Sequence, residues 1–194
     1  MPLTSTDSAV LSPETVAGTC PNSLLRAVRA EVRLALGWQK TADRVARALR
    51  ANLPDPADLL PADLRNGDPV GYQSHLLYAE PDSSFSISAM VWLPGQETAI
   101  HDHVAWCVTA VLQGREDEEI FALTDGGRAL ALAAHNVNPA GSVSGFAPPG
   151  DIHRVRNIGA DVAVSLHVYG ADITRLGSSV RRTYDLPVAA PAAP

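Results

Sequence analysis

A His-x-His pair, His101 and His103, is the part of the sequence whose residue types and spacing are best suited to chemistry. In a β-strand, side chains two residues apart project from the same face, so both imidazoles point one way and Asp102 points the other. Two imidazoles on one face form half of a metal site. Paired histidines also occur hydrogen-bonded in ordinary cores, so the pair alone leaves both roles open.

A second block further along the chain, Pro148 to Asn157, carries another histidine, His153. Together the two blocks resemble the two-motif pattern of the cupin superfamily. The positions in register with that pattern are Gly95, His101, His103, Gly114, Pro148, Gly150, His153 and Asn157. The resemblance implies a mainly β fold, a cupin double-stranded β-helix or jelly-roll barrel, in which tight turns bring His153 across to the first pair.

The fourth position of the first motif, usually a Glu in cupins, is Cys107. The predicted site therefore has three neutral imidazoles and no carboxylate around a divalent ion. Imidazoles suit Fe(II), Zn(II), Ni(II) or Cu(II), and a positive centre favours anionic ligands such as a substrate thiolate. Hydrolysis by a three-histidine zinc centre is the rival chemistry, because zinc-bound water titrates near neutral pH.

Ser165, His167 and Tyr169 occupy alternate positions of a predicted strand and therefore face the same way. Alone, they would suit a polar strand face exposed to water. With the three-histidine motifs and the Cys in the Glu position, they make residues 72–184 similar to the cysteine dioxygenase family of thiol dioxygenases. The resemblance implies a mononuclear non-haem Fe(II) centre where a small thiol, L-cysteine or a close analogue such as 3-mercaptopropionate, reacts with O2 as co-substrate to give a sulfinic acid.

The same resemblance implies roles for individual residues. The three histidines would be the metal ligands, and the three strand residues would form a hydrogen-bonded relay whose phenol, Tyr169, orients substrate and oxygen. Some family members cross-link the Cys in this position to the Tyr. Cys107 could do the same here, or it could be a small buried thiol.

The substrate-binding side departs from the family pattern. Family members hold the substrate carboxylate with an Arg, or in a bacterial subgroup a Gln, two residues after a Tyr; here Ser74 follows Tyr72 at that spacing. A serine cannot form the charge-assisted fork of an arginine. Gln73 would reach in only if the strand register slipped by one residue. The predicted substrate-binding residues are Tyr72, Ser74, His75 and Trp106, and the other cations that could take over the carboxylate are His75, Arg154, Arg156, Arg175, Arg181 and Arg182.

Three alternative functions remain open. The first is a cupin of a biosynthetic pathway that oxidises cysteine further, with loss of carbon dioxide, to an aldehyde bearing a sulfonamide. The second is a non-enzymatic cupin that binds a metal or small ligand, although such a protein would not need the Ser-His-Tyr strand. The third is a zinc or nickel enzyme without oxygen chemistry.

Composition limits the partners. The 194 residues include 21 acids and 15 bases, a formal net charge of -6, and 46% of them are apolar. This balance argues against nucleic acid as a partner, and no apolar run approaches a membrane span. The N-terminus lacks the pattern of a secretory signal, so we expect a cytoplasmic protein, a monomer or a small homo-oligomer. The two cysteines do not make a disulfide framework.

Periodicity divides the chain into four predicted parts: a flexible lead-in (1–20), an N-terminal helical segment (21–66), the cupin barrel (67–186) and a flexible tail (187–194). Apolar stripes predict one helix that begins at a cap on Asn22 or Ser23 and ends at Gly37, and another over Thr41–Asn52, both packed outside the barrel. Strands are predicted over residues 76–78, 85–92, 106–112, 119–123 and 162–169.

Overall fold

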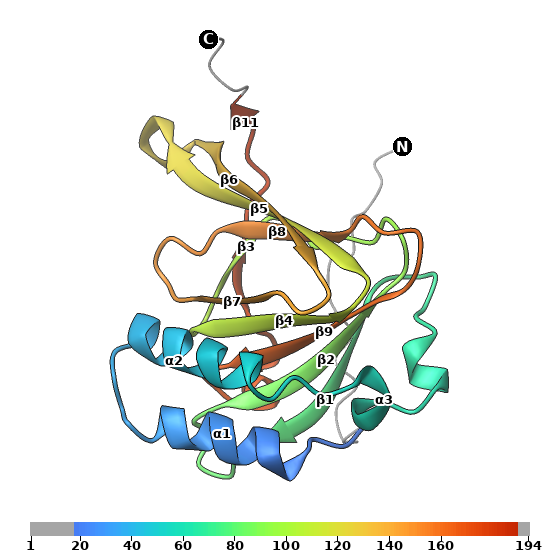
Figure 1. The fold of residues 1–194 in the computed structure, drawn as a ribbon. Helices are drawn as coiled ribbons and strands as arrows, with labels where there is room; N and C mark the ends of the chain where they lie inside the picture. The colour runs from blue at the N-terminus through green and yellow to red at the C-terminus, as the bar shows by residue number, and fades with distance from the viewer. Residues whose placement is uncertain (1–17, 190–194) are drawn as a thin grey trace.

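The structure is a computed structural model that describes residues 18–189. Two curled β-sheets face each other, and two helices pack outside one of them (Figure 1). The prediction of a mainly β cupin barrel with N-terminal helices outside is therefore confirmed. Most of the predicted lead-in (1–20) and the end of the predicted tail (187–194) lie outside the described residues.

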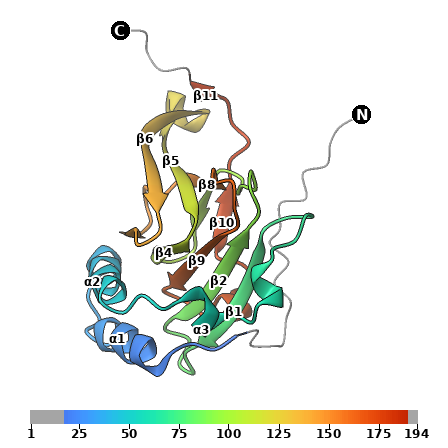
Figure 2. The same cartoon turned by 45° about the vertical axis from the view of Figure 1, so that its right-hand side comes forward.

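Two amphipathic helices, α1 (Asn22–Val32) and α2 (Trp38–Arg50), cover the outer face of one sheet. Both lie on the same side of the strands β1, β2 and β9 (Figure 2). Their buried apolar side chains, among them Leu24, Val28 and Val45, belong to one core cluster with that sheet, as an amphipathic helix requires. The short elements α3 (Pro56–Leu59) and η1 (Asp63–Arg65) then lead into the first strand.

The helix ends differ from the prediction. Pro21, and not Asn22 or Ser23, is the N-cap of α1, and no side chain caps the helix. The helix ends at Val32, well before Gly37, because the chain turns through Ala35 at a left-handed φ of 50°. Leu36 therefore leaves the apolar stripe and is 39% exposed.

The first sheet has five strands in the order β1-β2-β9-β4-β7. Every residue of β2 and β9 is buried, because the helices cover one face of this sheet and the other sheet covers the second face. Along β9, Val164, Leu166 and Val168 belong to the core cluster beneath the helices. Strand alternation then points Ser165, His167 and Tyr169 into the barrel. The strands are Gln73–Ala79 (β1), Ser86–Trp92 (β2), Ala163–Tyr169 (β9), Cys107–Gln113 (β4) and Val143–Phe146 (β7).

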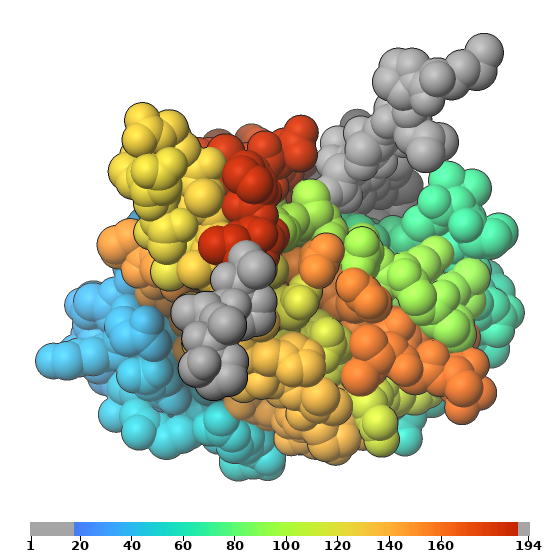
Figure 3. Space-filling view, turned by 90° about the horizontal axis from the view of Figure 1, so that it is seen from above, coloured from blue at the N-terminus to red at the C-terminus, as the bar shows by residue number. Residues whose placement is uncertain are grey.

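The second sheet has six strands in the order β10-β3-β8-β5-β6-β11. Its last strand, β11, pairs in parallel with β6, so the C-terminal segment lies beside the β5–β6 hairpin, as red beside yellow in Figure 3. The strands are Val180–Thr183 (β10), His101–His103 (β3), His153–Asn157 (β8), Arg115–Thr124 (β5), Ala129–Pro139 (β6) and Val188–Ala189 (β11).

Four strands, β6, β7, β10 and β11, were not among those predicted from the sequence. β6 and β11 are rich in Ala, a residue with a weak strand preference, β7 and β10 are only four residues long, and the pairing of all four depends on distant segments. A 3-10 turn, η2 (Asp125–Gly127), joins β5 to β6, and the short helix α4 (Ile173–Leu176) follows β9. Within residues 18–189, no helix has the length and apolar character needed to cross a membrane.

Candidate metal centre

The three predicted histidines meet inside the barrel on two neighbouring strands. β3 carries His101 and His103, and β8 places His153 directly opposite His101 in antiparallel register. The His101 ring centroid lies 4.7 Å from each of the other two, which are 5.0 Å apart. One ligand nitrogen of each residue lies within 4.8 Å of the others, and all three side chains are buried. The cluster is therefore a candidate metal centre.

In each of the three imidazoles, Nδ1 contacts a hydrogen-bond acceptor. His101 Nδ1 lies 3.0 Å from the carbonyl oxygen of Ala99, while His103 Nδ1 lies 3.2 Å from the Asp151 carboxylate. His153 Nδ1 lies 2.9 Å from the Glu118 carboxylate.

These contacts leave Nε2 of each ring for a ligand. His153 Nε2 is buried and has no hydrogen-bond partner among the described residues. Imidazoles oriented by carboxylates and carbonyls through the other ring nitrogen are typical of metal ligands. The residues present therefore fit a divalent ion.

Burial sets the charge state of His101 and His103. It lowers the pKa values of both His101 and His103, and the neighbouring imidazoles lower the pKa of His101 further. These rings are thus neutral at neutral pH, as metal ligands must be. Burial alone would raise the pKa values of Glu118 and Asp151, but hydrogen bonds from the histidines outweigh it and both pKa values are lowered.

Ser165, His167 and Tyr169 form a hydrogen-bonded row along β9. Ser165 Oγ lies 3.1 Å from His167 Nε2, and Tyr169 Oη lies 3.2 Å from His167 Nδ1. Trp92 Nε1 donates to Ser165 Oγ at 3.1 Å. Burial lowers the pKa of His167 to about 3, helped by His103, and burial raises that of Tyr169 well above its usual value. A neutral imidazole therefore faces a protonated phenol.

Cys107 stands directly opposite Tyr169 in the β4–β9 pairing. Residues directly opposite in an antiparallel pair share a sheet face, so the thiol and the phenol lie side by side. Burial raises the pKa of Cys107, and the carboxylate of Glu118 raises it further, so the side chain is a neutral thiol. It belongs to the cluster that also holds Tyr169 and Trp92 and does not line the cavity.

The three histidines of the cluster and two members of the β9 row, His167 and Tyr169, open onto one cavity of about 250 Å³. Tyr72 and Ser74 line the same cavity. Tyr72 stacks on Trp92, with ring centroids 4.3 Å apart. The Ser74 hydroxyl oxygen is buried and has no partner within residues 18–189, so it is available to a polar group of a bound molecule.

Two predicted substrate-binding residues, His75 and Trp106, are not brought to the cavity. Each is next in sequence to a residue whose side chain faces the barrel interior, so strand alternation turns it to the opposite face. Trp106 is 4% exposed in the core beneath the helices. Burial lowers the pKa of His75, so it is not a cation at neutral pH.

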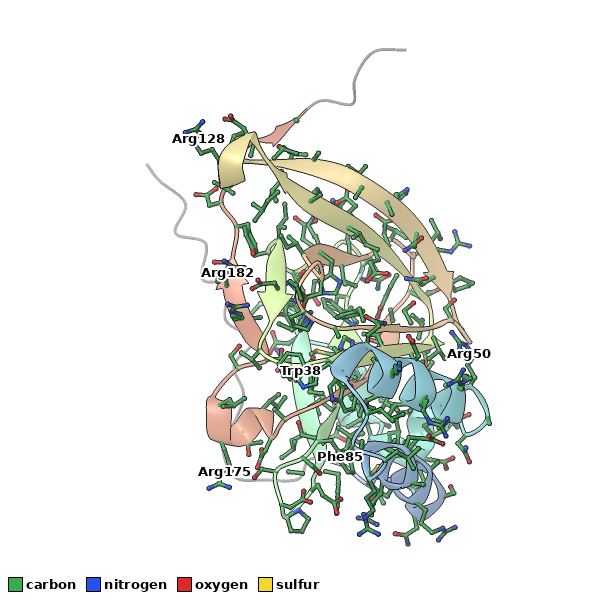
Figure 4. All side chains as sticks on the ribbon, turned by 90° about the vertical axis from the view of Figure 1, so that its left-hand side faces the viewer. Trp38, Arg50, Phe85, Arg128, Arg175 and Arg182 are labelled. Atoms are coloured by element: carbon green, nitrogen blue, oxygen red, sulfur yellow. The ribbon has the colours of Figure 1, made fainter. Side chains whose placement is uncertain are left out.

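The described cavity lining includes no Lys or Arg. Arg154 pairs with Glu119, and Arg156 pairs with Glu97. Arg182 pairs with Asp102, and Figure 4 shows it and Arg175 at the edge of the molecule. Neither these residues nor Arg181 reach the cavity, and Gln73 donates to the carbonyl of Gly71 instead. Ser74 stands where family members have a carboxylate-binding arginine, and none of the candidate cations within residues 18–189 takes the place of that arginine.

Sequence reasoning missed the carboxylates behind the imidazoles. Asp151 lies two residues before His153, and this proximity in sequence could have identified it as part of the site. In the structure, however, its carboxylate contacts His103 and not His153. Glu118 lies in the acidic run of β5 and gave no local signal. A further buried carboxyl on the same strand, Glu116, hydrogen-bonds to Ser165.

Comparison with solved structures finds proteins of low sequence identity to this chain. A recombinant oxalate oxidase in complex with glycolate is 20% identical, with a TM-score of 0.43 over 55% of this chain and 54% of that one; the chain thus spans about half of that relative. A Cupin 2 conserved barrel domain protein from Salinispora arenicola is 21% identical, with a TM-score of 0.41 over 53% of this chain and 78% of that one.

Comparison with family sequence models is more specific. Residues 58–177 match the model described as cysteine dioxygenase type I. The matched segment is more than half of the chain and contains the three histidines and the β9 row. The chain therefore belongs to the cysteine dioxygenase type I family, as a thiol-dioxygenase-like cupin whose three-histidine cluster suits a metal ion.

Proposed function

We propose that the protein is a mononuclear non-haem iron thiol dioxygenase that oxidises the sulfur of a small thiol with O2 to a sulfinic acid. One observation carries the proposal. Three imidazoles whose Nδ1 atoms are held by hydrogen-bond acceptors share a cavity with the phenol of Tyr169, which is hydrogen-bonded to the buried neutral imidazole of His167. The family supports the same reaction class. A site for metal storage would need the histidines but not the β9 row.

His101, His103 and His153 would hold the ion through Nε2. Bound Fe(II) would supply the redox chemistry between thiolate and oxygen. The protein's part is to position the reactants and to exclude water. The hydrogen bond to His167 holds the hydroxyl of Tyr169, which lines the cavity, and the stacked rings of Trp92 and Tyr72 form an aromatic part of the same wall. A thiol loses its proton on binding a metal, so the site must also dispose of one proton.

The substrate is a small thiol, L-cysteine or a close analogue such as 3-mercaptopropionate or cysteamine. A carboxylate end would meet the Ser74 hydroxyl and no guanidinium, since the cavity lining lacks Lys and Arg. A hydrogen bond to a charged group contributes about 1.5–3 kcal/mol. A single hydroxyl without a paired charge should contribute near the lower end of this range, so we expect thiols with and without a carboxylate to differ by about tenfold in kcat/KM.

A second outcome on the same scaffold follows from that cavity. A carboxylate that no cation clamps is free to leave as carbon dioxide, so cysteine could be oxidised further to a sulfonamide-bearing aldehyde. This alternative uses the same histidines and the same thiol. It differs in the product, which carries nitrogen on sulfur and has lost a carbon.

Oxygen uptake by the iron-loaded protein tests the proposal, with L-cysteine, 3-mercaptopropionate and cysteamine as substrates. We expect uptake with at least one thiol and a sulfinate by mass spectrometry. A decarboxylated sulfonyl product would favour the alternative outcome. No uptake with any of them would reject a dioxygenase. A His153→Ala variant, which should lose its iron and its activity together, serves as the metal-free control.

A further inference from the structure

Strand β5 carries two buried carboxyls that face the barrel interior, and only one of them serves a histidine. Glu118 accepts from His153. Glu116 is 3% exposed, and within residues 18–189 it forms no ion pair with Lys, Arg or His. Its Oε1 is buried without any partner. A buried carboxyl with so few partners is costly to retain, which points to a use.

The partner of Glu116 is the hydroxyl of Ser165, the first member of the β9 row. Ser165 Oγ therefore meets three groups: Glu116, Trp92 Nε1 and His167 Nε2. A hydroxyl has one proton to donate and two lone pairs. Since Trp92 can only donate, Ser165 must donate to either Glu116 or His167 and accept from the other.

The charge on Glu116 decides between these two arrangements. If Glu116 is a carboxylate, Ser165 donates to it, His167 Nε2–H donates to Ser165, and the Tyr169 hydroxyl donates to His167 Nδ1. If Glu116 is an acid, it donates to Ser165, Ser165 donates to His167 Nε2, and His167 Nδ1–H donates to the Tyr169 oxygen. The Tyr169 proton then points away from His167. Both arrangements use the same heavy-atom positions.

We propose that Glu116 is a positioning residue that sets the direction of the Ser165–His167–Tyr169 hydrogen bonds and takes up the proton lost by the substrate thiol. The proposal rests on the proposed function, since a bound thiol is the source of the proton. Glu116 acts at the Ser165 end of the row, which is far from the cavity. Its role is therefore separate from those of the Tyr169 phenol and the histidines.

The proton balance closes in one concerted transfer. The thiol S–H bond breaks, and its proton joins the Tyr169 oxygen. The Tyr169 proton moves to His167 Nδ1, and the His167 Nε2 proton moves to Ser165. The Ser165 proton then forms an O–H bond with Glu116. One proton has left the thiol and one has reached Glu116, while Tyr169, His167 and Ser165 keep their original proton counts.

The surroundings of Glu116 suit a proton acceptor near neutral pH. Asn138 on β6 and Asn157 on β8 stand opposite it and do not ionise. Glu118 on the same strand is the near charge, and His167 on β9 lies beyond Ser165. Burial raises the pKa of Glu116 to about 7, although the Ser165 hydrogen bond lowers it in part, and Glu118 raises it further.

The first test is infrared titration of the iron-loaded protein without thiol. We expect a protonated-carboxyl band that disappears through a pH of about 7 and is absent in Glu116→Gln. Glu119→Gln is the matched control, because the neighbouring Glu119 pairs with Arg154 on the other face of β5. If no band depends on Glu116 across the neutral range, Glu116 has no exchangeable proton there and the proposal is overturned.

The second test counts protons when L-cysteine or cysteamine binds anaerobically, using calorimetry in buffers of different ionisation enthalpy. In the native protein the number released should fall from about one to near zero as pH rises through about 7. Glu116→Gln and Ser165→Ala should release about one throughout, while Ser165→Ala keeps the infrared band. Equal release by native and Glu116→Gln protein would overturn the proposal. Neither test needs turnover. A protein that gives the expected results in both tests but shows no oxygenase activity would contradict the proposed function and not the role of Glu116.

Discussion

The Glu118 carboxylate is predicted to strengthen metal binding through His153. The pair is almost fully buried, with side-chain exposures of 7% for Glu118 and 5% for His153, and its atoms lie 2.9 Å apart. Groups that orient metal ligands in this way contribute about 10–100-fold to metal affinity, or about 1.4–2.7 kcal/mol. Glu118→Gln keeps an acceptor but removes the charge, so we expect a loss near tenfold; Glu118→Ala removes both, and we expect a loss near 100-fold.

Competition with a chromophoric chelator under anaerobic conditions measures this effect, with Fe(II) or the more air-stable Co(II). Glu119→Gln is the control, because Glu119 points to the other face of the same strand and pairs with Arg154. Its affinity should stay within about twofold of the native protein. Folded Glu118→Ala protein with native affinity would refute the reasoning, since His153 would then not depend on its carboxylate partner.

The remaining predictions concern substrate, phenol and pH. Ser74→Arg should raise the preference for 3-mercaptopropionate over cysteamine by about 10–100-fold in kcat/KM, through a charge-assisted hydrogen bond; Gln73→Arg, whose side chain should face away from the cavity, should leave the ratio unchanged. Tyr169→Phe should keep its iron but lower kcat by about 100-fold, measured by oxygen uptake with iron analysis; native kcat would place the phenol outside the reaction. Because the folded pKa of Glu116 is raised from 4.5 to about 7, the folded state binds more protons between these values, and its stability should fall by about 3 kcal/mol as pH rises through them. Urea unfolding at several pH values measures this contribution as the difference between the native protein and Glu116→Gln; an equal pH dependence in the variant would contradict the shift.

Local spacing was enough to predict the part of the fold that holds the histidines. His101 and His103 share a face because strand side chains alternate, and the second motif places His153 on a strand that the turns return to the same end of the barrel. The β9 row was visible for the same reason. These are properties of a few consecutive residues, which is why they can be read from sequence.

What sequence could not supply is which distant groups face the site. Glu118 and Glu116 lie in a run of acids that looks like a solvated strand, and only the pairing of β5 with β8 brings them inside. Trp106 follows the histidine motif closely, yet alternation turns it toward the helices. Nothing local indicates that every candidate arginine reaches a carboxylate or the surface instead of the cavity.

Oxygen labelling tests the central claim most directly. Iron-loaded protein would be incubated with a thiol under ¹⁸O2, and the product analysed by mass spectrometry. We predict a sulfinate in which both oxygen atoms come from O2. A product whose oxygen comes from water, or unchanged thiol in protein that carries its full complement of iron, would contradict the account.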